Sequence, residues 1–282
     1  MRVNTHTEFV ATRASTSADD LRQTPLFELL RVQGRVVIAL MLREIYTRFG
    51  RDNIGFAWII AEPAIFCLSV ILLWSFIKHS GHAETPIVPF LLTGYMPLLM
   101  YRHMVSRTMR CMQANAALLY HRQITVMTLY ISRIAVEILG TSAAFMFCML
   151  AFFLSGHIEV PDDPPLMLAG WLLYAWYAAA TAILVGALSE RSEVTEKIWG
   201  PISYVMIPLS GTFYMVDWMP AQVREAILWM PPVNGVEMIR GGYFTASVTA
   251  HFDAIYLVYV NLVLTACGLY VAKDARDHVE IE

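Results

Sequence analysis

Long stretches without any charged side chain dominate this sequence. A helix needs roughly 20 apolar residues to cross the hydrocarbon core of a bilayer. Four stretches approach or meet this length without a charge: 138–156, 164–189, 198–216 and 254–272. Ile54–Ile77 is interrupted only by Glu62, and 86–101 must continue past Arg102 and His103 to span. Because the backbone must satisfy its own hydrogen bonds in lipid, we expect an all-α integral membrane protein with six transmembrane helices.

Lysine and arginine are distributed unevenly between the segments that connect these spans. With a cytoplasmic N-terminus, segments 1–53, 102–133, 189–197 and 273–282 lie inside and hold 17 of the 20 basic residues. Basic residues accumulate on the cytoplasmic side, so we expect both termini there, as an even number of spans requires. The net charge of −3 gives no indication of nucleic-acid binding.

The same pattern divides the chain into four regions. Residues 1–24 are polar and are expected to form a flexible cytoplasmic tail, and 25–53 an amphipathic helix at the cytoplasmic interface. Residues 54–273 form the six-span transmembrane domain, and 274–282 a second cytoplasmic tail.

The interfacial region carries charges on two faces. Glu28, Arg31 and Arg35 share one helical face, whereas Glu44, Arg48 and Arg51 share the roughly opposite one. A single straight helix lying on a bilayer cannot keep both sets in water. We therefore expect a bent amphipathic helix, or two short ones.

Glu62 and Pro63 lie well inside the first apolar stretch. A charge near the bilayer centre costs on the order of 3 kcal/mol, so Glu62 must pair with an arginine, become protonated or face an aqueous cavity. The candidate partners are Arg102, Arg107 and Arg133. Pro63 removes a helix hydrogen bond and favours a kink. A gate for lateral entry and a packed, neutralised glutamate are both open interpretations.

Two segments outside the spans have unusual composition. Residues 107–122 contain Asn115, Leu118, Leu119 and Arg122, which predicts a short polar-capped helix whose apolar side chains need a cover. Nearby, Arg133 and Glu137 are spaced i, i+4 at the start of the third span, and we expect them to pair with each other.

The second segment, 217–253, is long for a simple loop, but its apolar stretch is too short to span. It contains Trp229 and breakers that include Pro231 and Pro232. This pattern favours a periplasmic re-entrant helical hairpin that forms the lip of a cavity.

Aromatic side chains gather near the ends of the spans. Most are expected to form interfacial belts. Tyr204 and Phe213, however, lie in a span interrupted by proline and glycine, where rings could face a water-filled path and stack on sugars. The candidate residues for a translocation path or gate are Trp58, Glu62, Pro63, Tyr95, Tyr204, Phe213 and Tyr214.

Motifs of bond chemistry are missing from the sequence. No lysine follows a glycine, which rules out a Walker A phosphate loop, and neither a zinc-protease nor a nucleophile-elbow motif occurs. We therefore expect no catalytic residue, no metal and no cofactor in this chain.

Several short motifs together carry a family resemblance over roughly residues 27–273. The most specific are Arg43-Glu44, Thr47-Arg48-Phe49-Gly50, Gly55-Phe56-Ala57-Trp58 and Glu62-Pro63. Supporting positions are Asn115, Leu118, Leu119, Arg122, Gln123, Arg133, Glu137, Pro231, Glu237, Arg240, His251 and Tyr256. The chain resembles permeases of ABC-2 type polysaccharide exporters, especially the inner-membrane subunit of Gram-negative group 2 capsule exporters. It departs from the family where Val126 and Thr128 replace a common proline and aspartate.

The resemblance implies a homodimer in the bacterial inner membrane, with two copies of a separate cytoplasmic ATPase that binds ATP and magnesium. It also implies a periplasmic co-polymerase-type adaptor, an outer-membrane export component and a lipid-linked capsular polysaccharide as substrate. The implied ATPase-coupling residues are Glu44, Arg48, Arg51, Asn115, Leu118, Leu119 and Arg122. The implied re-entrant residues are Trp229, Pro231, Pro232, Glu237 and Arg240.

Other functions remain open at this point. Within transport, the substrate could be O-antigen, teichoic acid, or a drug or small amphipathic lipid. From another class, a membrane-embedded glycosyltransferase or lipid-modifying enzyme is conceivable, but the chain lacks paired carboxylates near a cytoplasmic site.

Overall fold

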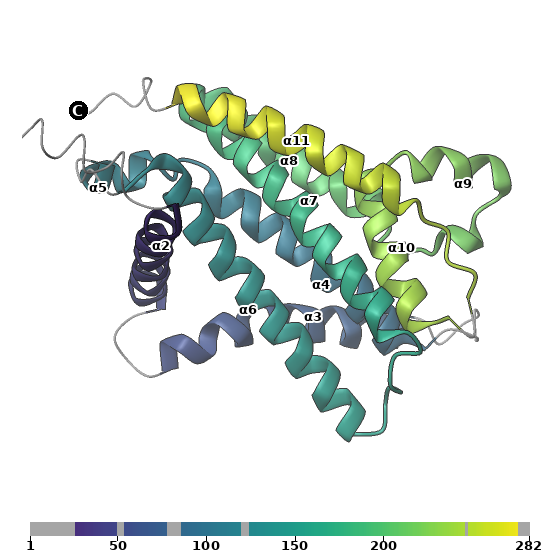
Figure 1. Ribbon diagram of the computed structural model, residues 1–282. Coiled ribbons are helices and arrows are strands. Elements are labelled where there is room, and N and C mark those ends of the chain that lie inside the picture. The colour runs from purple at the N-terminus through teal and green to yellow at the C-terminus, as the bar shows by residue number, and fades with distance from the viewer. Residues whose placement is uncertain (1–25, 50–53, 78–85, 120–123, 246–247, 276–282) are drawn as a thin grey trace, which may run out of the picture.

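The apolar stretches form helices that lie side by side as one bundle (Figure 1). The computed structural model describes residues 26–49, 54–77, 86–119, 124–245 and 248–275, and these contain helices and connecting turns but no strand. The long helices are α2 (Leu26–Phe49), α3 (Ile54–Ile77), α4 (Ile87–Thr108), α6 (Val126–Leu154), α7 (Pro164–Arg191), α8 (Glu193–Leu209) and α11 (Ala254–Ala275). The short ones are η1 (Gln113–Asn115), α5 (Ala116–Leu119), η2 (Val216–Trp218), α9 (Ala221–Leu228) and α10 (Pro231–Tyr243).

Four of the helices are long and apolar enough to cross a membrane: α3, α6, α7 and α11. Their outer faces carry large apolar side chains that no other part of the described chain covers, such as Phe76, Leu154 and Ile255. We expect lipid to cover these faces, because the surface of a soluble protein rarely carries so many exposed large apolar side chains. The expected all-α membrane protein is thus confirmed, with four spans supported by length and composition.

Helix α7 occupies the centre of the bundle, between α4, α10 and α11 (Figure 1). Glycines permit its closest approaches. A Cβ at Gly170 would lie 2.8 Å from the Ile239 nitrogen of α10, and one at Gly186 would lie 2.7 Å from Thr108 of α4. Small residues therefore bring the backbones of these helices together, as is common in membrane bundles.

Helix α8 does not follow the predicted stretch 198–216. It begins earlier, at Glu193, and ends at Leu209. Gly211 then adopts a positive φ of 76°, which turns the chain away from the helix direction. The prediction was wrong at this end because the apolar composition continues through Val216 although the backbone turns.

Helix α6 begins at Val126, where the sequence departs from the family pattern. Thr125 caps its N-terminus, and Thr125 and Thr128 bond reciprocally in a capping box. Threonine at this point therefore supplies a helix start without the common proline and aspartate.

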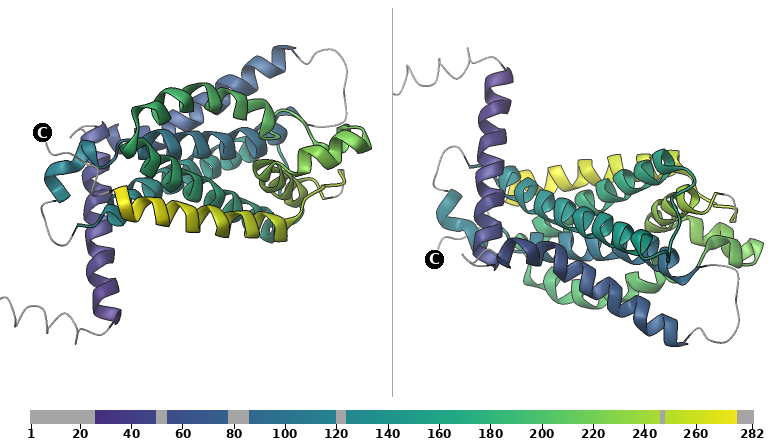
Figure 2. Two further views of the ribbon diagram at one scale, coloured as in Figure 1. Left: turned by 90° about the horizontal axis from the view of Figure 1, so that it is seen from above. Right: turned by 90° about the horizontal axis from the view of Figure 1, so that it is seen from below.

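Helix α2 is one unbroken helix of 24 residues, not two short ones. Figure 2 shows it running crosswise over one end of the bundle as a straight rod. The prediction of a bend assumed that both charged faces must reach water. The structure instead buries Glu44 and Arg48 against α6, so a straight helix suffices.

The segments expected on one side of the membrane meet at one end of the bundle. Arg43 of α2 donates to Asn115 of η1 (2.9 Å), and Arg191 at the end of α7 donates to the Val271 carbonyl of α11 (3.1 Å). At the opposite end, the Asp163 amide donates to the Gly242 carbonyl (2.8 Å). The structure thus separates the expected inside and outside segments in space.

Candidate functional site

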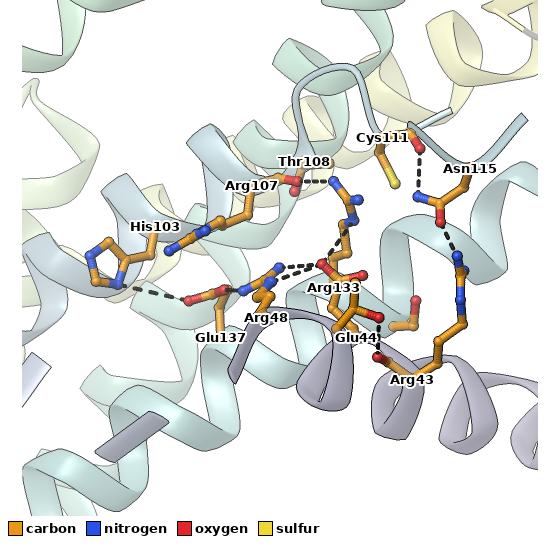
Figure 3. A network of polar contacts seen from close by, with 12 residues as sticks. Arg43, Glu44, Arg48, His103, Arg107, Thr108, Cys111, Asn115, Arg133 and Glu137 are labelled. Carbon is orange, nitrogen blue, oxygen red and sulfur yellow. Dashed lines mark hydrogen bonds and ion pairs between the residues drawn. The ribbon is translucent and has the colours of Figure 1, made fainter. Parts of the chain in front are cut away.

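Charged side chains of α2, α4 and α6 meet in one polar network where α2 crosses the bundle (Figure 3). Arg48 forms ion pairs with Glu44 of its own helix (2.8 Å) and with Glu137 of α6. The side chains of Arg48 and Glu137 are only 12% and 10% exposed. Because charges buried to this extent need partners, the pair fixes where α2 sits on α6.

Arg133 takes part in the same network but not with its predicted partner. It approaches Glu44 (3.5 Å) and donates to the Arg107 carbonyl of α4 (2.5 Å). The predicted Arg133–Glu137 pair is therefore wrong. Charges from α2 reach both residues and offer each of them a better-placed partner than the i, i+4 neighbour.

Glu62 lies at the edge of this network, half-buried on α3. Its carboxylate is 3.7 Å from the Arg107 guanidinium, so one of the three candidate arginines is its partner. Together with Pro63, His103 and Glu137, this pair lines a small polar pocket between α3, α4 and α6. Pairing, rather than isolation in hydrocarbon, accounts for a charged residue in the first span.

The segment after α4 connects to α2 through Asn115. The Asn115 side chain accepts from Arg43 (2.9 Å) and donates to the Cys111 carbonyl (2.9 Å). Burial raises the pKa of the Cys111 thiol to about 12, so this side chain stays neutral and packs as an apolar group.

Leu118 and Leu119 follow on α5. Both are half-buried, with part of each side chain against the core and the rest uncovered, so they are less exposed than the sequence suggested. Of the other proposed coupling residues, Arg51 and Arg122 lie outside the described residues.

A groove of about 390 Å³ runs between α3, α4 and α8. Tyr95 and Tyr204, two of the path candidates, line it from facing helices. Arg102 lies over the Tyr204 ring, 5.5 Å from its centroid, in cation–π geometry. Sequence reasoning missed Arg102 and Trp199 as lining residues, although the arginine next to an apolar span was a usable signal.

The remaining aromatic path candidates do not line this groove. Phe213 stacks on Trp74 of α3 (5.4 Å between centroids) and lies 6.3 Å from Tyr95, which makes a second aromatic cluster. Trp58 is exposed on α3, and Tyr214 follows the turn after α8. Trp74 was missed because nothing near it in sequence shows that Phe213 reaches it.

At the other end of the bundle, Arg240 of α10 is buried, with 2% of its surface exposed. It donates to the carbonyls of Gly211 (2.6 Å), Thr212 (2.6 Å) and Tyr214 (2.5 Å). Its guanidinium also lies 4.2 Å from the centroid of the Phe90 ring. One side chain therefore holds the turn after α8 against α10 and α4.

Glu237 and the two prolines complete the predicted re-entrant segment. Glu237 lies 3.9 Å from Arg240 and accepts from the amide of Val216 (3.1 Å). Pro231 and Pro232 open α10, where the missing N–H groups are not needed. The structure thus forms two helices, α9 and α10, from residues expected to form a hairpin, and buries α10 between α4, α7 and α11.

Trp229 lies apart from this buried helix. It is exposed at the turn between α9 and α10, and its ring meets Tyr256 edge-on, with 5.9 Å between the ring centroids.

Among the described residues, no group of three or more His, Cys, Asp or Glu side chains could hold a metal ion.

The chain is similar to known membrane proteins over most of its length. Residues 35–244 match the family of ABC-2 type transporters. The capsule polysaccharide export inner-membrane protein CtrC of Neisseria meningitidis is 38% identical over 92% of this chain and 98% of its own. The protein of the same description, BexB of Haemophilus influenzae, is 36% identical over 92% of this chain and 97% of its own. The polysialic acid transport protein KpsM of Escherichia coli is 26% identical over 87% of this chain and 95% of its own.

Proposed function

The chain belongs to the ABC-2 type transporter family, and we propose that it is the permease subunit of an ATP-driven exporter of lipid-linked capsular polysaccharide. One observation carries this proposal: the similarity to capsule export inner-membrane proteins extends over nearly the full length of both chains. The inner membrane follows as its location.

We further propose six spans with both termini in the cytoplasm, adding α4 and α8 to the four helices named above. Helix α4 has 22 residues and passes Arg102 and His103 before it ends. Helix α8 has 17 residues and is about 25 Å long at 1.5 Å per residue, slightly less than the hydrocarbon core. The gathering of basic segments at the α2 end supports this orientation. The α9–α10 segment would then form the periplasmic re-entrant hairpin.

In this arrangement α2 and the segment Gln113–Leu119 face the cytoplasm. We propose that they dock a separate ATPase chain, which supplies ATP and magnesium binding, and that two permeases and two ATPases assemble together. The Arg43–Asn115 bond links the two surfaces, so a force on one reaches the other. The adaptor and outer-membrane component would continue the export route beyond the periplasmic end.

For the route itself, we propose the groove between α3, α4 and α8. Its tyrosines offer flat faces for sugar rings, and its open side lets a lipid-linked chain enter from the membrane. The Glu62–Arg107 pair lies beside the groove, where it could gate entry.

Deletion of the gene with localisation of the glycan tests the proposed function. We expect lipid-linked capsular polysaccharide to accumulate in the cytoplasm, and a plasmid copy of the wild-type gene to restore surface polymer. Normal surface polymer in the deletion strain would refute the proposal. Accumulation of O-antigen or another lipid-linked glycan instead would assign a different substrate to the same transporter.

Replacing Leu118 and Leu119 together by aspartate tests the coupling segment. We expect export to fall about tenfold, because two new charges disrupt an apolar contact with the ATPase while ATP hydrolysis continues. Surface polymer and the ATPase rate of the purified complex are the measurements. Val160→Asp, which adds a charge at an exposed position between α6 and α7, far from the proposed ATPase contact, is the control. Unchanged export by the double variant would remove this segment from the mechanism.

A further inference from the structure

The turn after α4 contains a residue in an unusual backbone conformation. Arg110 has a φ of 50°, in the left-handed region that side chains other than glycine rarely adopt. Such a conformation persists only where surrounding contacts impose it, and it often marks a working part of a protein. The contacts around Arg110 therefore need an explanation.

The backbone of this turn is bound to the cytoplasmic end of α7. The Arg110 amide donates to the Ser189 hydroxyl (3.1 Å), and the Met112 amide donates to the Glu190 carboxylate (2.6 Å). Ser189 and Glu190 are both buried. These two bonds hold the turn against α7, and the left-handed backbone at Arg110 sets the direction in which its side chain extends.

The Arg110 side chain extends to the first turn of α8. Its Nε lies 2.7 Å from Glu196, and its Nη2 lies 3.8 Å from Glu193. Both carboxylates occupy the first turn of a helix capped by Ser192. The arginine of one segment therefore holds the beginning of another helix by two acidic side chains.

Helix α8 is weakly packed along the rest of its length. Trp199 is its one buried residue, near Tyr101 of α4. Farther along, Tyr204 is exposed beneath Arg102 at the groove. Because α8 buries so little surface against the other helices, it can shift relative to them as a unit. The contact of Arg110 with its first turn therefore has a large influence on its position.

We infer that Arg110 is a positioning residue that transmits movement of the segment Gln113–Leu119 to α8. A displacement of that segment moves the turn that carries Arg110. The ion pairs then pull on Glu193 and Glu196 at the start of α8. Movement of α8 changes the position of Tyr204 relative to Arg102. The groove then opens or closes. This inference rests on the proposed role of the segment as the ATPase contact and names the residue through which that contact acts.

The geometry separates this role from simple stabilisation. The side chains of Arg110 and Glu196 are 36% and 47% exposed, and ion pairs so open to solvent contribute little to stability. Their loss should leave the fold intact, while the turn after α4 loses its side-chain link to α8 and keeps only its bonds to α7.

Arg110→Gly is the sharpest variant, because glycine adopts the positive φ without strain and only the side chain is lost. In cells carrying the variant and its ATPase, we expect surface polymer to fall about tenfold. The ATP hydrolysis rate of the purified complex should stay within about twofold of wild type, so less polymer is exported per ATP. Lys197→Ala removes an exposed cation that pairs with Glu193 within α8 (3.8 Å) but does not connect α8 to the turn after α4, and it should change neither quantity.

Charge exchange provides the second test. Arg110→Glu should lose export, and Arg110→Glu combined with Glu196→Arg should regain most of it by restoring the pair in reverse. If Arg110→Gly reaches the membrane poorly, Glu193→Gln with Glu196→Gln removes the acceptors without altering the turn and should show the same loss.

The outcomes distinguish this inference from the proposed function. Wild-type export per ATP in Arg110→Gly, or in the double glutamine variant if the first is scarce, overturns the role of Arg110 alone. Failure of the charge exchange to restore export in a stable protein also counts against it. Normal export by the Leu118 and Leu119 aspartate variant refutes the coupling role of the segment, whatever Arg110 does.

Discussion

Replacing Arg240 by alanine is expected to remove most of the protein from the membrane. The change leaves the carbonyls of Gly211, Thr212 and Tyr214 without their donor inside the protein. An unsatisfied buried group costs about 1–3 kcal/mol, so three of them approach the whole stability of a typical domain, about 5–15 kcal/mol. Glu237 also loses its nearby cation. Protein abundance in membranes and the unfolding midpoint of any purified protein are the measurements.

Two further variants sharpen this test. Arg240→Lys keeps a charge but replaces a planar fork of donors by a single ammonium, so abundance should fall between wild type and alanine. Arg224→Ala is the comparison variant, because Arg224 is a partly exposed arginine on α9 that pairs with Asp217 (3.5 Å) and donates to the carbonyls of Asp217 and Met219. Its loss should cost clearly less than the loss of Arg240, because these acceptors lie near solvent and can bond water instead. Wild-type abundance and an unchanged unfolding midpoint for Arg240→Ala would show that the turn after α8 is held by other contacts.

The features that could be predicted from sequence depend on composition or on one residue alone. Lipid demands long apolar helices, so α3, α7 and α11 lie where long apolar stretches predicted them. A carboxylate in the first span demands a partner, so Glu62 was expected to pair with one of three arginines and does so with Arg107. Each of these constraints acts locally and needs no knowledge of the fold.

The features that were missed depend on which segments meet. The charges on α2 seemed to require two solvent faces, because nothing near them in sequence shows that α6 brings Glu137 to Arg48, 89 residues away. The same contact replaces the predicted Arg133–Glu137 pair. Arg240 was counted among the basic residues outside the membrane, and its burial becomes visible only when α10 packs against the turn after α8. A lone arginine beside Gly241 and Gly242 was the available signal.

Replacing Glu137 by alanine is expected to loosen α2 from the bundle. Arg48 would then keep only Glu44, which Arg133 also approaches, so two cations would share one carboxylate. Breaking a buried ion pair from one side costs about 3–5 kcal/mol, and the remaining partner reduces this to about 2–3 kcal/mol. Amide hydrogen exchange in α2, measured on protein in lipid nanodiscs, should increase together with a fall in the unfolding midpoint.

A double replacement decides whether the charge itself or the packing of these side chains holds α2. Arg48→Met with Glu137→Leu removes one cation and one anion, leaves Glu44 with Arg133, and preserves most of the buried volume. Because neither charge is then left unpaired, this variant should be more stable than Glu137→Ala. A double-mutant cycle compares its loss of stability with the sum of the losses in the single variants Arg48→Met and Glu137→Leu, and the difference should be on the order of 1–3 kcal/mol. Additive effects in the cycle would mean that Arg48 and Glu137 do not interact in the membrane-bound protein. If the double variant keeps α2 docked yet exports poorly, the network beneath α2 serves transport directly and not only the anchoring of this helix.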